Sequence, residues 1–194
     1  MSTTGDRGAH WYLTTDLMLC YNYSSTPHNL LCVKCVAPKC VRDFDTAAPA
    51  QSSYHFCTES FNIGINVTPK GSFVDLHHDI TRRGLSKTIG KCKKIWLLFP
   101  STPENLELYI ASAGFSNRLA RIGSKLRGGI IVETDSAHEL EFPAGTLHAV
   151  FTTIGGFLAG INYSTAECLP TMSRVLKAHL PIFHISPDHI FKNI

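Results

Sequence analysis

The chain has 194 residues, of which 44% are hydrophobic and 17% charged, which is the composition of one globular domain with a sizeable core. Its net charge of +3 comes from 18 Lys and Arg against 15 Asp and Glu, and the basic residues are dispersed, so there is no direct nucleic-acid signal. No apolar run approaches the ~18 residues that a membrane-spanning helix needs, and the start lacks a secretory leader pattern, so we expect no membrane segment and an intracellular location, in nucleus or cytoplasm.

The N-terminal part, residues 1–58, has no sustained apolar period and is rich in Ser, Thr and Cys, which predicts an irregular segment. It contains PHNLLCVKCVAPKC, in which a CxxC pair has a histidine before it and another cysteine after it. A single CxxC favours buried free thiols, while ligands at this spacing can also close a tetrahedral zinc site. The candidate ligands of a structural zinc are His28, Cys32, Cys35 and Cys40, with Cys57 or Cys20 in reserve.

The central part, residues 59–165, consists of short apolar runs separated by turn residues. Many short strands punctuated by Gly and Pro predict an all-β core, either a sandwich or a barrel. The runs are FNIGINV, SFVDLHHD, KKIWLLFP, GGIIVETD, HELEFPAG and HAVFTTIGGFLAGINYS.

Two helices are predicted, and we expect both to pack outside the β core. The first begins in STPENLELYIASA, where Ser101 and Glu104 fit a capping box and Pro103 is tolerated in the first turn. The second is AECLPTMSRVLKAH, inside a C-terminal helical extension over residues 166–194. Its predicted apolar face consists of Leu169, Met172, Val175 and Leu176.

Three residues of the central part form a candidate metal site. Strand side chains alternate, so His77 and Asp79 project to one side and His78 to the other. His148, after the turn-rich EFPAGT, is the best third ligand from another strand. Two imidazoles and one carboxylate leave three adjacent positions open on an octahedral metal, which suits non-heme iron(II). With ten histidines in the chain, chance and an ordinary core histidine are the alternatives for these residues.

A lysine in the central part is a candidate anion-binding residue. GKCKKIWLLFP is apolar except for its leading lysines. Strand lysines are commonly solvated. A lysine that points inward beside the strand of His77 and Asp79, the HxD pair, would instead offset the desolvation of a bound carboxylate.

In order and spacing, GSFVDLHHD, GKCKKIWLLFP and LEFPAGTLHAVFTTIGGFLAGINYS resemble the Jumonji C (JmjC) domain, over roughly residues 61–164. The resemblance implies a double-stranded β-helix, which is a jelly-roll or cupin barrel, with peripheral helices. It also implies that iron(II) is held by His77, Asp79 and His148. The co-substrate 2-oxoglutarate would be bound by Lys94, with Lys93 as the alternative because a one-residue slip reverses a strand's faces. Asn162 matches an asparagine that lies near the co-substrate in related domains.

Two positions depart from the JmjC pattern. Val74 stands where relatives often have a threonine whose hydroxyl helps to bind the 2-oxoglutarate carboxylate. The tyrosine that assists from the preceding strand has no clear counterpart, and Asn66 is the candidate substitute.

The resemblance implies an iron(II)- and 2-oxoglutarate-dependent dioxygenase. It would hydroxylate, or by hydroxylation demethylate, a protein substrate such as a histone methyl-lysine or another protein side chain. Two alternatives remain open: a catalytically impaired barrel that acts as a binding or scaffold module, which Val74 supports, and a cupin-like metal enzyme that uses no 2-oxoglutarate.

Overall fold

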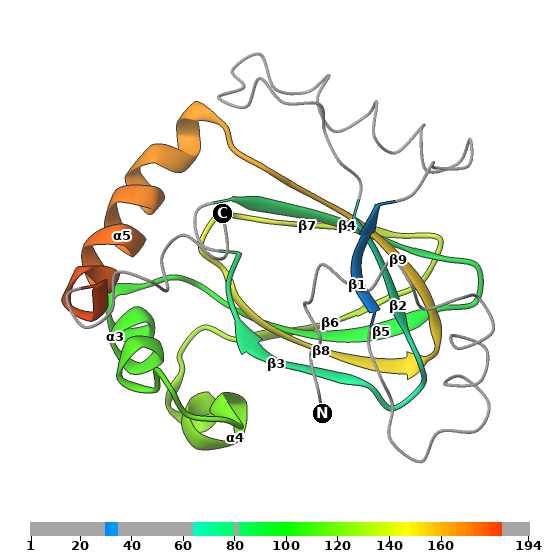
Figure 1. Ribbon diagram of the computed structural model, residues 1–194, viewed down its shortest axis with the longest axis horizontal. Coiled ribbons are helices and arrows are strands. Elements are labelled where there is room, and N and C mark those ends of the chain that lie inside the picture. The colour runs from blue at the N-terminus through cyan, green and yellow to red at the C-terminus, as the bar shows by residue number, and fades with distance from the viewer. Residues whose placement is uncertain (1–29, 35–63, 80–81, 184–194) are drawn as a thin grey trace.

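A computed structural model describes residues 30–34, 64–79 and 82–183 of the chain (Figure 1). Within these residues, nine strands build two antiparallel sheets, one with the order β1-β2-β9-β4-β7 and one with the order β3-β8-β5-β6. The strands are β1 (Leu30–Lys34), β2 (Gly64–Thr68), β3 (Phe73–His77), β4 (Arg83–Ile89), β5 (Lys93–Phe99), β6 (Ile130–Thr134), β7 (Glu139–Phe142), β8 (Leu147–Ile154) and β9 (Gly156–Tyr163).

The two sheets face each other, and the chain crosses repeatedly from one to the other, which is the jelly-roll arrangement of a double-stranded β-helix. The predicted fold is therefore confirmed. Helices gather at one end of the sheets in Figure 1, outside the β core as expected. They are α3 (Pro103–Ala111), α4 (Arg118–Ile122) and α5 (Leu169–Phe183), with short 3₁₀ turns at η2 (Gly123–Lys125) and η3 (Ala166–Cys168). No helix in the described ranges is long and apolar enough to cross a membrane.

The strand register shows which side chains face the barrel interior, because cross-strand partners carry their side chains on the same face of the sheet. A buried apolar cluster joins the two sheets across this interior. It consists of Trp96, Leu98, Phe142, Val150 and Leu158.

Beside this cluster, the interior row of the five-stranded sheet is small and polar. On β9 the residues that share the face of Leu158 are Gly160 and Asn162. Their partners on β4 are Ser86 and Gly84. The ring of Phe142 occupies the position that a Cβ at Gly84 would take, whereas a Cβ at Gly160 would meet only ordinary contacts.

A second apolar cluster packs the helices onto the outside of the four-stranded sheet. Here Leu76, Phe99 and Leu147, at the ends of their strands, contact helical side chains. The helical members of the cluster are Tyr109, Ile122 and Leu126, from α3, α4 and the residue after η2. The helices therefore buttress the end of the barrel at which β3 ends and β8 begins.

Several elements differ from the sequence-based expectation. Strand β1 lies in the segment predicted to be irregular, and it pairs with β2. Strand β4 was not predicted, because its inward positions are Gly84, Ser86 and Thr88, which carry no apolar period. Helix α4 was also missed, since five residues give too few turns for a helical period to show.

The predictions for α3 and α5 each need one correction. Thr102, not Ser101, caps α3, because its side chain accepts from Asn105 N at 3.2 Å with Pro103 directly after it. On α5, Val175 is fully buried, but Leu169 and Leu176 are 49% and 42% exposed, so the predicted apolar face is only partly packed.

The predicted segment boundaries fit the element order. Strands β2 to β9 lie within residues 59–165 and α5 lies within residues 166–194. The division into segments stays a prediction.

Candidate metal centre

The three predicted metal ligands come together where β3 ends and β8 begins. His77 and His148 are cross-strand partners with ring centroids 4.1 Å apart, and Asp79 follows β3 by two residues. One ligand atom from each of the three residues lies within 4.8 Å of the others. No other group of three His, Cys, Asp or Glu side chains converges in this way within the described ranges.

A β-bulge in β3 aims His77 into the barrel. Val74 pairs with Val150 and His77 pairs with His148, so three steps on β3 match two steps on β8 (77 − 74 = 3, 150 − 148 = 2). Strict alternation from the inward-facing Val74 would turn His77 outward. The extra residue instead sends Leu76 outward into the helical cluster and His77 inward.

Asp75, inside the bulge, fastens it to the start of α4. Its carboxylate accepts from the backbone N–H groups of Leu76 at 2.8 Å, Arg118 at 2.6 Å and Leu119 at 3.0 Å. The N-cap residue of α4, Asn117, makes no side-chain cap of its own, so Asp75 performs that function from another element. Nothing in the sequence marks Asp75, because its partners lie in a helix that was not predicted.

Main-chain carbonyls fix the tautomer of both histidines. His77 Nδ1 lies 2.8 Å from Asp75 O, and His148 Nδ1 lies 3.0 Å from Thr146 O. A carbonyl oxygen only accepts, so each Nδ1 must carry a hydrogen, and in the neutral form of each ring the lone pair is on Nε2, where a metal can bind it.

The electrostatics of the site also suit a cation. Burial, followed by the proximity of His77, holds the pKa of His148 well below its usual value, so this imidazole is neutral at pH 7. The imidazole nitrogens of His77 and His148 and the Asp79 carboxylate form the donor set that suits iron(II) with open positions. The residues present therefore fit the metal that the JmjC resemblance implies.

His78 takes no part in this group. Its Nε2 lies 3.0 Å from Nε2 of His179 on α5, and its ring contacts Tyr109 on α3. Burial lowers the pKa of His78 to about 3. His78 therefore connects the metal-binding strand to the surrounding helices.

Lys94 lies inside the barrel and is only 2% exposed. Its Nζ donates to Thr68 Oγ1 at 2.6 Å and to Thr152 Oγ1 at 2.9 Å. Burial lowers its pKa to about 8. Within the described ranges, no carboxylate lies within ion-pair distance of Lys94, whereas the partly exposed Lys93 is 3.7 Å from Glu133. Of the two candidate lysines, the inward one is Lys94.

The remaining candidates for co-substrate contact lie on interior rows. Asn66 pairs with Leu158, and both belong to the row that faces the barrel interior. Asn162 is exposed and lies near the metal end, since it and His148 are each seven residues from Gly155, where the chain changes sheets (162 − 155 = 7, 155 − 148 = 7). Val74 packs against the apolar cluster of the interior.

The candidate ligands of a structural zinc lie in the N-terminal part of the chain. His28, Cys35 and Cys40 lie outside the described residues, as do Cys20 and Cys57, and the side chain of Cys32 is also outside them. A structural zinc stays a prediction.

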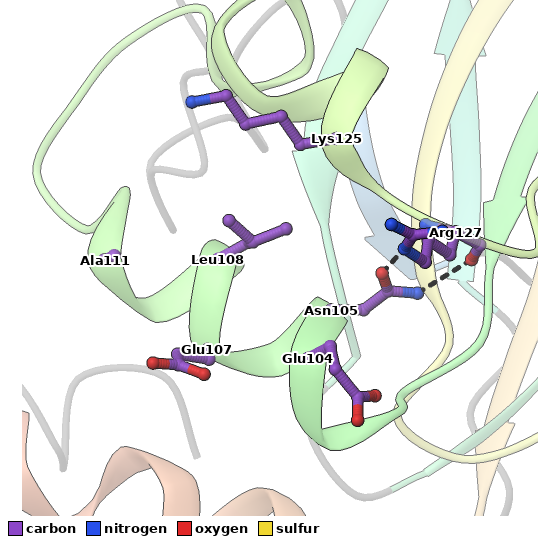
Figure 2. A pocket seen from close by; sticks show the side chains of 7 residues that line it. All are labelled: Glu104, Asn105, Glu107, Leu108, Ala111, Lys125 and Arg127. Carbon is purple, nitrogen blue, oxygen red and sulfur yellow. Dashed lines mark hydrogen bonds between the residues drawn. The ribbon is translucent and has the colours of Figure 1, made fainter.

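A hollow of about 450 Å³ lies at the surface between α3 and the η2 region (Figure 2). Asn105 closes its inner side by donating to Arg127 O and accepting from Arg127 N. The hollow is lined by acidic and basic side chains and shares no residue with the metal site. Its lining residues are Glu104, Asn105, Glu107, Leu108, Ala111, Lys125 and Arg127.

Curated proteins resemble this chain, although no family model matches it. It is 34% identical over 98 residues to the JmjC domain-containing histone demethylation protein 1 of Candida glabrata, which covers 50% of this chain and 24% of that protein. It is 29% identical over 114 residues to the protein of the same name from Saccharomyces cerevisiae, which covers 58% of this chain and 23% of that protein. The match to the Debaryomyces hansenii protein is 25% over 156 residues, 71% of this chain and 29% of that protein.

The chain thus spans about a quarter of the length of these relatives. Together, the similarities support a JmjC domain in this chain, as the residue patterns predicted.

Proposed function

We propose that this chain is an iron(II)- and 2-oxoglutarate-dependent oxygenase of the JmjC type, acting in the nucleus on a protein substrate. The observation that carries the proposal is the burial of the Lys94 side chain inside the barrel. This lysine is a buried cation without an acidic partner among the described residues, and it lies on the same inner face as His148.

Burying a charge is unfavourable unless a partner of opposite charge offsets its desolvation. A carboxylate bound inside the barrel would supply that partner. Thr88, on an interior row of the facing sheet, also has a buried hydroxyl without a partner in the described part of the chain. An anionic, polar ligand in the interior fits both groups.

Each side chain then has a separate task. His77 and His148 would each donate an imidazole nitrogen to iron(II), and Asp79 would donate a carboxylate oxygen. When bound, iron(II) supplies the oxidation chemistry, in which 2-oxoglutarate becomes succinate and CO₂. Lys94 would hold the distal carboxylate, and Trp96 and Val150, between Lys94 and His148 in the strand register, would exclude water.

The names of the relatives indicate which substrate to try first. They are histone demethylation proteins, so a histone peptide with a methylated lysine is the first candidate. Hydroxylation of the N-methyl carbon gives a hemiaminal, whose C–N bond breaks to release formaldehyde and the lysine amine. Hydroxylation of another protein side chain would stop at the first step.

The test is a panel of methylated and unmodified histone peptides, incubated in air with the iron(II)-loaded protein and 2-oxoglutarate. We expect one peptide to lose a methyl group or gain an oxygen by mass spectrometry, with an equal amount of succinate. Asp79→Ala should abolish both products. Lys93→Ala, which removes the partly exposed lysine next to Lys94, should retain them. Succinate that forms equally with every peptide and with none would contradict the assignment of a histone substrate.

Val74 favours a second candidate function, a catalytically impaired barrel that acts as a binding or scaffold module. Its methyl groups add to the apolar cluster of the interior, where the JmjC resemblance leads one to expect a hydroxyl. This alternative predicts a folded protein that binds a metal but neither binds 2-oxoglutarate nor releases succinate.

A further inference from the structure

A chain of buried hydroxyl groups surrounds the Lys94 ammonium. Ser72 Oγ donates to Thr152 Oγ1 at 3.1 Å, and Thr152 Oγ1 lies 3.3 Å from Thr68 Oγ1, to which it donates. All four residues are 2% exposed. They come from β2, β5, β8 and the residue before β3, so both sheets contribute.

The hydrogen bonds around Lys94 leave capacity for a ligand. An ammonium has three N–H donors, and two of them are used by Thr68 and Thr152. The contact from Thr152 to Thr68, at 3.3 Å, exceeds the 2.5–3.0 Å range of good O–H···O hydrogen bonds and is therefore weak. The Thr152 hydroxyl can rotate its hydrogen to a better acceptor at small cost.

Thr152 also lies close to the position of Val74, whose side chain has no hydroxyl. Val74 pairs with Val150 on β8, and Thr152 is the next residue on the same face of that strand. A hydroxyl missing from β3 is therefore available from the neighbouring strand, beside the same lysine.

We propose that Thr152 supplies, with Lys94, the hydrogen bond to the distal carboxylate of a 2-oxo dicarboxylic acid, the contact that Val74 cannot make. Ser72 and Thr68 hold the Thr152 hydroxyl in place. The proposal rests on the proposed function, because it assigns a carboxylate-binding residue for that co-substrate. It predicts that affinity for the co-substrate resides in β5 and β8.

The test measures binding, not turnover. The protein is loaded with Mn(II), which stands in for iron(II) without redox chemistry, and 2-oxoglutarate is titrated by calorimetry. Thr152→Val keeps the side-chain shape but removes the hydroxyl, and we expect the Kd to rise about tenfold or more. Thr134→Val is the matched control, because Thr134 is a buried inward threonine whose hydroxyl contacts Trp96 instead of Lys94. Its Kd should change less than about twofold.

A rescue variant separates ligand binding from a merely structural role. Val74→Thr restores a hydroxyl at the neighbouring position, so the double variant Val74→Thr/Thr152→Val should recover most of the affinity for 2-oxoglutarate. Wild-type affinity in Thr152→Val would overturn the proposal. So would a weakened Thr152→Val that Val74→Thr does not rescue, which would assign Thr152 to the fold alone.

The same titration distinguishes the two proposals. If the Mn(II)-loaded wild-type protein and Thr134→Val bind no 2-oxoglutarate, the proposed function fails together with this inference. If wild type binds it, Lys94→Met does not, and Thr152→Val binds as wild type does, only the inference about Thr152 fails.

Discussion

The two ends of the barrel interior are built by different means. At the metal end, main-chain carbonyls of Asp75 and Thr146 orient the two histidines. At the lysine end, side-chain hydroxyls of Thr68 and Thr152 orient Lys94. Geometry set by main-chain atoms survives the substitution of neighbouring side chains, whereas a hydroxyl can be supplied from any of several strands. We therefore expect the lysine end to tolerate substitutions that the metal end does not.

The largest expected effect is at the metal end. His148→Ala removes a buried ligand with a fixed tautomer, so the affinity for Mn(II) should fall more than about 100-fold, and 2-oxoglutarate should no longer bind. Calorimetry with Mn(II) measures both. His138→Ala, at an exposed surface histidine, is the control and should bind as wild type does. Equal Mn(II) affinity in both variants would remove His148 from the site.

At the lysine end, Lys94→Met should separate ligand binding from stability. Loss of the cation should weaken the binding of 2-oxoglutarate about 100-fold and leave the affinity for Mn(II) unchanged. Because an uncompensated buried charge is also lost, the ligand-free protein should gain about 1 kcal/mol in free energy of unfolding. Thermal denaturation and calorimetry test the two effects, with Lys93→Met as control. A destabilised variant that still binds 2-oxoglutarate would contradict the assigned role.

Co-substrate binding should depend on pH through Lys94, whose pKa burial lowers to about 8. The ammonium form binds the carboxylate, so affinity is retained below pH 8 and falls about tenfold for each pH unit well above it. In the ligand-free protein the sign is opposite: the unfolded chain keeps its proton to higher pH, so this group makes the free energy of unfolding rise between about pH 8 and its ordinary pKa of 10.5. Anaerobic titrations of the Mn(II)-loaded protein from pH 7 to pH 9 measure the first effect. An affinity that does not change over this range would show that no ammonium is involved.

The smallest expected effect on binding concerns Asp75, which connects the bulge to α4. Asp75→Ala leaves the N–H groups of Arg118 and Leu119 without their acceptor, so the free energy of unfolding should fall by about 1–2 kcal/mol. The carbonyl that orients His77 remains but is held less firmly, so Mn(II) affinity should fall by about tenfold at most. Asp135→Ala, at an exposed turn, is the control for both measurements. A larger loss of Mn(II) affinity than in His148→Ala would contradict the order of effects.

The sequence predicted those parts of the molecule that have a local pattern. Alternating apolar runs indicated most of the strands, and HxD with a distant histidine indicated the metal group. Strand β4 was not predicted, because its inward residues are Gly84, Ser86 and Thr88, which carry no apolar period.

The rest of the site depends on contacts between distant segments. Nothing local marks the bulge that turns His77 inward, and alternation from Val74 would have given the opposite face. Thr68 and Thr152 are ordinary strand residues in the sequence, and only the register of separate strands places both beside Lys94.

The most direct test of the account is an anaerobic titration of the iron(II)-loaded protein with 2-oxoglutarate, followed by exposure to air in the presence of the histone peptides. Wild type should show saturable, 2-oxoglutarate-dependent spectral change and then release succinate, while His77→Ala should show neither. Lys94→Met should bind iron(II) but require far more 2-oxoglutarate. A wild-type protein that binds iron(II) without any response to 2-oxoglutarate, and is indistinguishable from Lys94→Met, would contradict the claim that the two ends of the barrel work as one site.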